Sequence, residues 1–65
     1  MTLGERIKKY RKSNGCTQAD LAFALGVTNQ TVSKYEKGII TNIGIENLFK
    51  IADVLRIDIV DLLFD

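Results

Sequence analysis

Apolar residues recur along this chain at the three- and four-residue spacing of amphipathic helices. In residues 2–13, Leu3, Ile7 and Tyr10 fall at i, i+4 and i+7 and form one apolar stripe. Residues 45–55 repeat the pattern with Leu48, Phe49, Ile51, Ala52 and Leu55. No proline interrupts these segments. The pattern therefore predicts helices and no strand.

The segment from residue 17 to residue 37 carries two helix-start signals with a short connection between them. Thr17 and Thr28 can each cap a helix, because a threonine oxygen accepts from an unpaired N–H of the first turn. We expect the first helix to end at Gly26 and the second to run to Lys37. Two short helices joined by such a tight, glycine-bearing turn form a helix-turn-helix.

A fifth helix is expected after Asp58, with Leu62 and Ile59 entering the core. Gly44 is an acceptable, slightly weaker N-cap for the helix before it. Arg56 lies between these last two helices, where two conformations are open. Either Arg56 adopts a positive φ at a cost of ~1 kcal/mol, or the turn has another shape.

The chain resembles the Cro/C1-type (XRE) helix-turn-helix regulators over nearly its whole length. Spacing carries the resemblance, because Val32 follows Gly26 by six residues and a Tyr-Glu-x-Gly motif comes next. The matching residues are Arg11, Gln18, Leu21, Ala22, Gly26, Val27, Val32, Tyr35, Glu36 and Gly38. The resemblance implies an all-α, compact five-helix, lambda-repressor-like DNA-binding domain spanning residues 1–65. It also implies a transcriptional regulator, most simply a repressor that occupies a dyad-symmetric operator.

The second helix of the motif would then enter the major groove of double-stranded DNA. Its polar residues at helical spacing share one face, while Val32 and Tyr35 turn toward the core. Asn and Gln can pair with adenine and Lys with guanine. The candidates for base contact are Asn29, Gln30, Ser33 and Lys34. The candidates for phosphate contact are Gln18, Thr28, Thr31, Lys37, Thr41 and Asn42.

Gln18, Arg11 and Glu36 each have two possible roles. Gln18 can be an ordinary exposed residue of a first helical turn, although the resemblance implies a phosphate contact. Arg11 can reach phosphate and Glu36 can be solvated. The resemblance favours a structural salt bridge between these two, joining the first helix to the end of the third.

Charge divides unevenly along the chain, although the formal net charge is only +1. Residues 1–40 hold seven basic and three acidic side chains, a balance of +4, and residues 41–65 hold two and five, a balance of −3. Such asymmetry favours a DNA-facing end and an acidic end turned away from phosphate. Scattered surface charge is the simpler alternative.

The C-terminal segment is more apolar than one buried helix face requires. We expect Val60, Leu63 and Phe64 to form a homodimer interface, because exposed apolar patches mark interfaces. The alternative is that they cap a small core or face an effector domain absent from this chain.

Composition narrows the remaining functions. One cysteine and no histidine give no disulfide framework and no ordinary zinc site. We expect no cofactor, no metal and no catalytic site, since no nucleophile–base pair or phosphate-binding glycine loop is present. The N-terminus lacks an apolar signal region, so a cytoplasmic protein without a membrane segment is expected. Two alternatives stay open: the antitoxin of a toxin–antitoxin pair, and a protein-interaction module that has lost DNA affinity.

Overall fold

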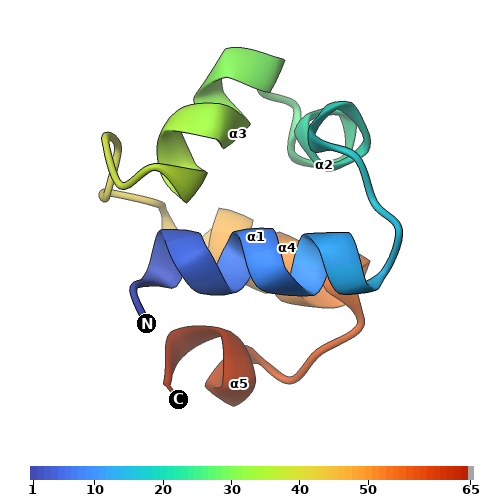
Figure 1. Ribbon diagram of the computed structural model, residues 1–65, viewed down its shortest axis with the longest axis vertical. Coiled ribbons are helices and arrows are strands. Elements are labelled where there is room, and N and C mark those ends of the chain that lie inside the picture. The colour runs from blue at the N-terminus through green and yellow to red at the C-terminus, as the bar shows by residue number, and fades with distance from the viewer. Residues whose placement is uncertain (65) are drawn as a thin grey trace.

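The computed structural model describes residues 1–64, and Asp65, which was counted in the acidic part above, lies outside them. Five helices make up the described chain, which contains no strand. They are α1 (Leu3–Ser13), α2 (Gln18–Leu25), α3 (Asn29–Glu36), α4 (Ile45–Leu55) and α5 (Ile59–Leu63). The predicted all-α, five-helix fold is confirmed (Figure 1).

A threonine side chain forms the N-cap of each of the first three helices. Thr17 accepts from the backbone N–H of Asp20 at 3.0 Å, and Asp20 accepts from the backbone N–H of Thr17 at 3.0 Å, which completes a capping box. Thr2 and Glu5 form the same box at the start of α1. The pKa of Asp20 and the pKa of Glu5 are both lowered, mainly because each carboxylate accepts a hydrogen bond from the backbone N–H of the capping threonine, Thr17 or Thr2. The start of α2 is therefore fixed by local sequence, as expected for Thr17, whereas the same box at Thr2 was not predicted.

Two helices end on a residue in the left-handed conformation. Gly26 closes α2 with φ 70°, which glycine adopts without a steric penalty. Arg56 closes α4 with φ 57° and ψ 42°. The first of the two alternatives for Arg56 therefore holds, and the strain of ~1 kcal/mol expected for a side chain in this region applies to it.

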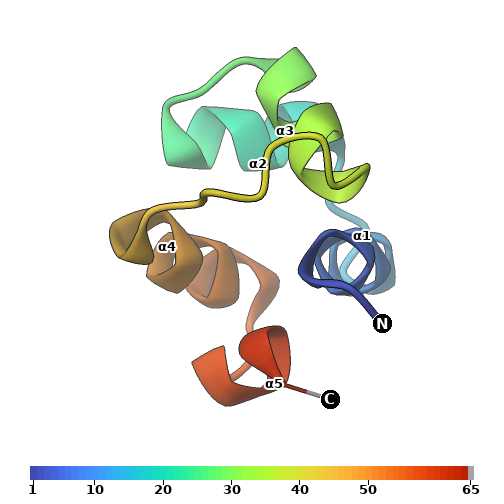
Figure 2. The same cartoon turned by 90° about the vertical axis from the view of Figure 1, so that its left-hand side faces the viewer.

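The core lies where all five helices meet. Figure 2 shows α1 and α4 in the middle of the molecule, with α2 and α3 beyond one end and α5 at the other. Buried side chains from every helix fill the space between them: Ile7, Leu21, Ala22, Leu25, Val32, Tyr35, Ile51, Ala52, Leu55 and Leu62, with Ile43 from the loop before α4. Ile59 packs against this core and Leu62 is fully buried, as expected for α5. Within residues 1–64, no helix has both the length and the apolar content needed to cross a bilayer.

Gly4 lets α1 approach the end of α3 closely. A β-carbon at this position would lie 2.3 Å from the carbonyl oxygen of Tyr35 and 2.7 Å from that of Glu36. Both neighbours are backbone atoms, so a side chain would have to push the two helices apart. Gly4 thus sets the distance between α1 and α3, a role that the sequence pattern did not indicate.

Candidate nucleic-acid interface

A buried ion pair joins α1 to the end of α3. The Nε of Arg11 donates to Oε2 of Glu36 at 2.6 Å, and its Nη2 donates to Oε1 at 3.2 Å. The two side chains are only 9% and 3% exposed. The third donor of the guanidinium, Nη1, reaches the carbonyl oxygen of Cys16 at 2.9 Å. The ion pair expected between Arg11 and Glu36 is therefore present, and it lies inside the protein.

Gln18 joins the same carboxylate from the first turn of α2. Its amide nitrogen donates to Oε1 of Glu36 at 3.0 Å. Glu36 thus accepts from residues of both α1 and α2 while belonging to α3. Because a side-chain amide nitrogen carries two N–H groups, one remains for a ligand. The family resemblance implied a phosphate contact for Gln18 and did not indicate its contact with Glu36.

The outward face of α3 is polar and accessible. Asn29, Gln30 and Lys34 are exposed, and Ser33 is partly exposed. Val32 is fully buried on the opposite face, and Tyr35 is 7% exposed. Burial of this opposite face fixes the rotation of the helix, so the polar residues expected to share one face do so.

The start of α3 is held by two threonines. Oγ1 of Thr28 accepts from the backbone N–H of Thr31 at 3.2 Å and lies 2.9 Å from the Oγ1 of Thr31. Thr28 is exposed, and Thr31 is partly exposed. Unpaired N–H groups in a first helical turn attract anions such as phosphate. The expected phosphate contacts at this end are therefore open to a ligand.

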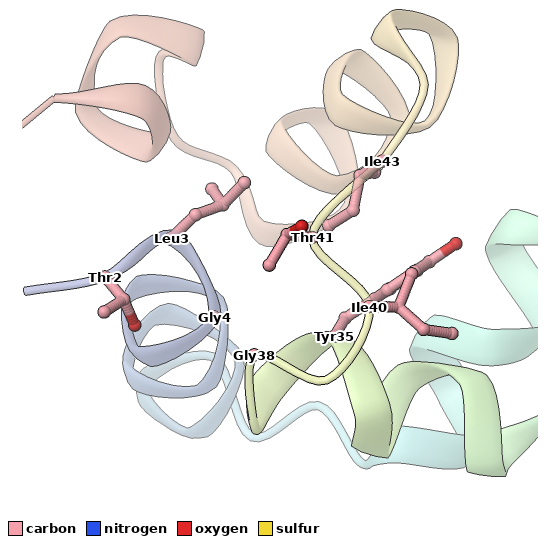
Figure 3. Close-up of a pocket in the computed structure, with 8 residues that line it drawn as sticks. All are labelled: Thr2, Leu3, Gly4, Tyr35, Gly38, Ile40, Thr41 and Ile43. Atoms are coloured by element: carbon pink, nitrogen blue, oxygen red, sulfur yellow. The ribbon is translucent and has the colours of Figure 1, made fainter.

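The loop after α3 passes beside the first turn of α1. Lys37, Thr41 and Asn42 are exposed along it, whereas Ile40 and Ile43 turn inward and pack against the core. A cavity of about 190 Å³ lies beneath the loop, lined by Thr2, Leu3, Gly4, Tyr35, Gly38, Ile40, Thr41 and Ile43 (Figure 3). Ligand pockets usually measure ~300–1,000 Å³, so this one is small for a cofactor.

Two of the seven basic residues in residues 1–40 are not surface charges. Arg11 is engaged with Glu36, and Arg6 is 9% exposed and directed at α5. The positive charge open to solvent comes instead from lysines: Lys8, Lys9 and Lys12 on α1, Lys34 on α3 and Lys37 after it. The balance of +4 counted for residues 1–40 is therefore larger than the net positive charge that these residues expose to solvent.

The predicted dimer residues belong to α5 and its C-cap, and Figure 1 shows α5 at the end of the molecule away from α3. Val60 is 56% exposed and Phe64 is 66% exposed, while Leu63 is partly exposed. The apolar surface that the sequence predicted on α5 is thus accessible.

Comparison with known proteins adds to this geometry. The sequence model of the helix-turn-helix family matches residues 7–62. The transcriptional regulator SinR of Bacillus subtilis is 38% identical over 61 residues, which cover 94% of this chain and 55% of that protein. This chain thus spans about half the length of the relative it matches.

Solved structures show the same fold. A SinR structure in complex with DNA matches with a TM-score of 0.84 and 36% identity, covering 94% of this chain and 97% of that one. The P22 c2 repressor bound to a synthetic operator matches with a TM-score of 0.85 and 32% identity, covering 97% of this chain and 94% of that one. SinR in complex with SinI matches with a TM-score of 0.87 and 36% identity, covering 98% of this chain and 62% of that one.

Proposed function

This chain belongs to the helix-turn-helix family, of the Cro/C1 type, and we propose that it is a sequence-specific regulator that binds double-stranded DNA. One observation carries the proposal: the polar face of α3 is exposed while its opposite face is locked into the core. SinR is a transcriptional regulator and the P22 c2 protein is a repressor, which agrees with the expectation from the sequence that this chain is not an enzyme.

In this proposal α3 lies in the major groove and reads bases with its outward face. Base contacts come from Asn29, Gln30, Ser33 and Lys34, with Gln30 suited to adenine N6 and N7. Phosphate contacts come from Gln18, Thr28, Thr31, Lys37, Thr41 and Asn42. The phosphate contacts set the register of the domain on the duplex, and the base contacts supply the sequence preference.

We further propose that two copies bind as a dimer through Val60, Leu63 and Phe64. Recognition helices of such dimers lie about 34 Å apart, so each must lie about 17 Å from the dyad. The molecule is 26 Å long, and α3 and α5 lie toward opposite ends of this longest dimension. A dyad beside α5 is therefore compatible with the spacing that a dyad-symmetric operator requires.

Repression by occupancy is the simplest mechanism, because a dimer on an operator blocks polymerase without any further activity. The P22 c2 protein is a repressor, which supports this sign of regulation. We also propose that this repressor acts in the cytoplasm. A second candidate is a protein-interaction module, which the SinR complex with SinI and the exposed apolar residues of α5 favour.

Charge reversal on two faces tests the DNA-binding surface without knowledge of the operator. Lys34→Glu changes the proposed contact face, and Lys50→Glu makes the same charge change on α4, between Glu46 and Asp53. Affinity for a duplex is measured by fluorescence anisotropy between 50 and 200 mM salt. We expect Lys34→Glu to weaken binding at least tenfold and to reduce the salt slope by about 1. Lys50→Glu should change affinity less than threefold. Equal losses for both variants, or binding without salt dependence, would favour the protein-interaction module.

A further inference from the structure

Arg6 connects α1 to the last turn of α5. Its Nε donates to the carbonyl oxygen of Leu62 at 2.7 Å, and its Nη2 donates to that of Leu63 at 2.9 Å. The third nitrogen, Nη1, donates to the carbonyl oxygen of Met1 at 2.6 Å. The side chain is 9% exposed, so this contact is built into the protein and is not a chance surface pairing.

The short helix α5 depends on such support. It has five residues, and a helix of this length is not stable by itself. The last carbonyl groups of any helix lack partners within the helix and carry partial negative charge. A planar guanidinium can satisfy two neighbouring carbonyl oxygens at once, which a lysine ammonium does less well. Arg6 therefore holds the C-terminal end of α5 against α1.

Helix α1 carries this constraint across the molecule to α3. Arg11 is anchored to Glu36 near one end of α1, and Gly4 packs against the backbone of α3 near the other. Arg6 lies between them and holds α5. Helix α1 is thus a direct link between α5 and α3.

We infer that Arg6 is a specificity-determining residue that selects the spacing between operator half-sites without touching DNA. The inference rests on the proposed dimer through α5. One added base pair moves a half-site by about 3.4 Å and rotates it by about 35°. A dimer with rigid α5 helices cannot follow that change, whereas a dimer whose α5 can swivel accommodates several spacings.

The test compares operators that differ only in spacing. Half-site centres are moved by one and by two base pairs in each direction, and a duplex with a single half-site measures binding of one domain. The proteins are wild type, Arg6→Met, Arg6→Lys and Lys8→Met, which removes an exposed positive charge from the same helix as a matched control. Circular dichroism and sedimentation establish folding and dimerisation of each protein at the assay temperature.

Wild type and Lys8→Met should prefer one spacing by at least tenfold. Arg6→Met should reduce that preference to less than threefold while its affinity for the single half-site stays within twofold. Arg6→Lys keeps the positive charge but lacks the planar guanidinium, so its preference for one spacing should lie between those of wild type and Arg6→Met. If Arg6→Met does not fold, Arg6→Lys is compared with wild type instead. A folded Arg6 variant with the wild-type preference would overturn the inference. A wild-type protein that is monomeric and shows no preferred spacing would overturn the proposed dimer and this inference with it.

Discussion

Replacing Arg11 by methionine should be among the most destabilising single changes in this protein. The Glu36 carboxylate would keep the amide of Gln18 at 3.0 Å as a donor and would lose both donors from the guanidinium. Removing one partner of a buried ion pair costs ~3–5 kcal/mol, because the other charge stays buried without compensation. Domains have a total stability of ~0.05–0.15 kcal/mol per residue, or about 3–10 kcal/mol for a chain of this size. Arg11→Met should therefore be close to unfolding at 25 °C.

A double-mutant cycle separates the ion pair from the packing around it. Replacing both residues, as Arg11→Met with Glu36→Leu, removes the buried charges together. Apolar replacement of a whole buried pair is often neutral or stabilising, so the double variant should lie within about 2 kcal/mol of wild type. The free energy of unfolding of all four proteins is measured by urea denaturation at one pH and temperature. Single-variant costs below 1 kcal/mol, or a double-variant cost equal to their sum, would refute the reasoning.

Four further predictions follow from other parts of the structure. Gly4→Ala should lower the free energy of unfolding, measured by urea denaturation, by about 1–3 kcal/mol, because the added β-carbon meets backbone atoms. Gly44→Ser, at a position with open space around it, should raise the same free energy by about a few tenths of a kcal/mol. Hydrogen bonds in the capping box lower the pKa of Asp20. The ionised carboxylate therefore contributes its full stabilisation to the folded protein above about pH 4, and this contribution is lost as the pH falls through the pKa of Asp20 in the folded protein. Asp20→Asn should therefore lose less stability than wild type on acidification; an equal loss in the two proteins would contradict this. Gln30→Ala should reduce the preference for the operator more than it weakens binding to random duplex, by ~1–3 kcal/mol of discrimination in competition binding, and an equal loss on both would count against a base contact. Phe64→Asp should shift the protein toward monomer in sedimentation, and an unchanged mass would remove α5 from the proposed interface.

Features that depend on neighbouring residues in the chain could be predicted from the sequence. The caps at Thr17 and Thr28, the turn at Gly26 and the single polar face of α3 all follow from spacings of a few residues. The contact between Arg11 and Glu36, which are 25 positions apart, was expected only because the chain resembles a known family. Local spacing thus identifies the motif and the face that it exposes.

Features that depend on contacts between distant elements could not be predicted in this way. Arg6 is 56 positions from Leu62, and nothing in its neighbourhood distinguishes it from an exposed arginine of an amphipathic helix. Gly4 reads as an ordinary helix residue until α3 is placed against it. Gln18 is turned toward Glu36 by the way α2 packs on α3. These three roles follow from tertiary packing, which helical periodicity does not predict.

Selection from a random pool of duplexes tests the central claim most directly. Duplexes bound by the wild-type chain are enriched over several rounds, and the affinity of the winning sequence is measured against salt concentration. Binding as a dimer through α3 predicts an inverted repeat with half-site centres about 10–11 base pairs apart and a steep loss of affinity with salt. No enriched sequence, together with micromolar or weaker binding, would contradict sequence-specific DNA recognition by this chain.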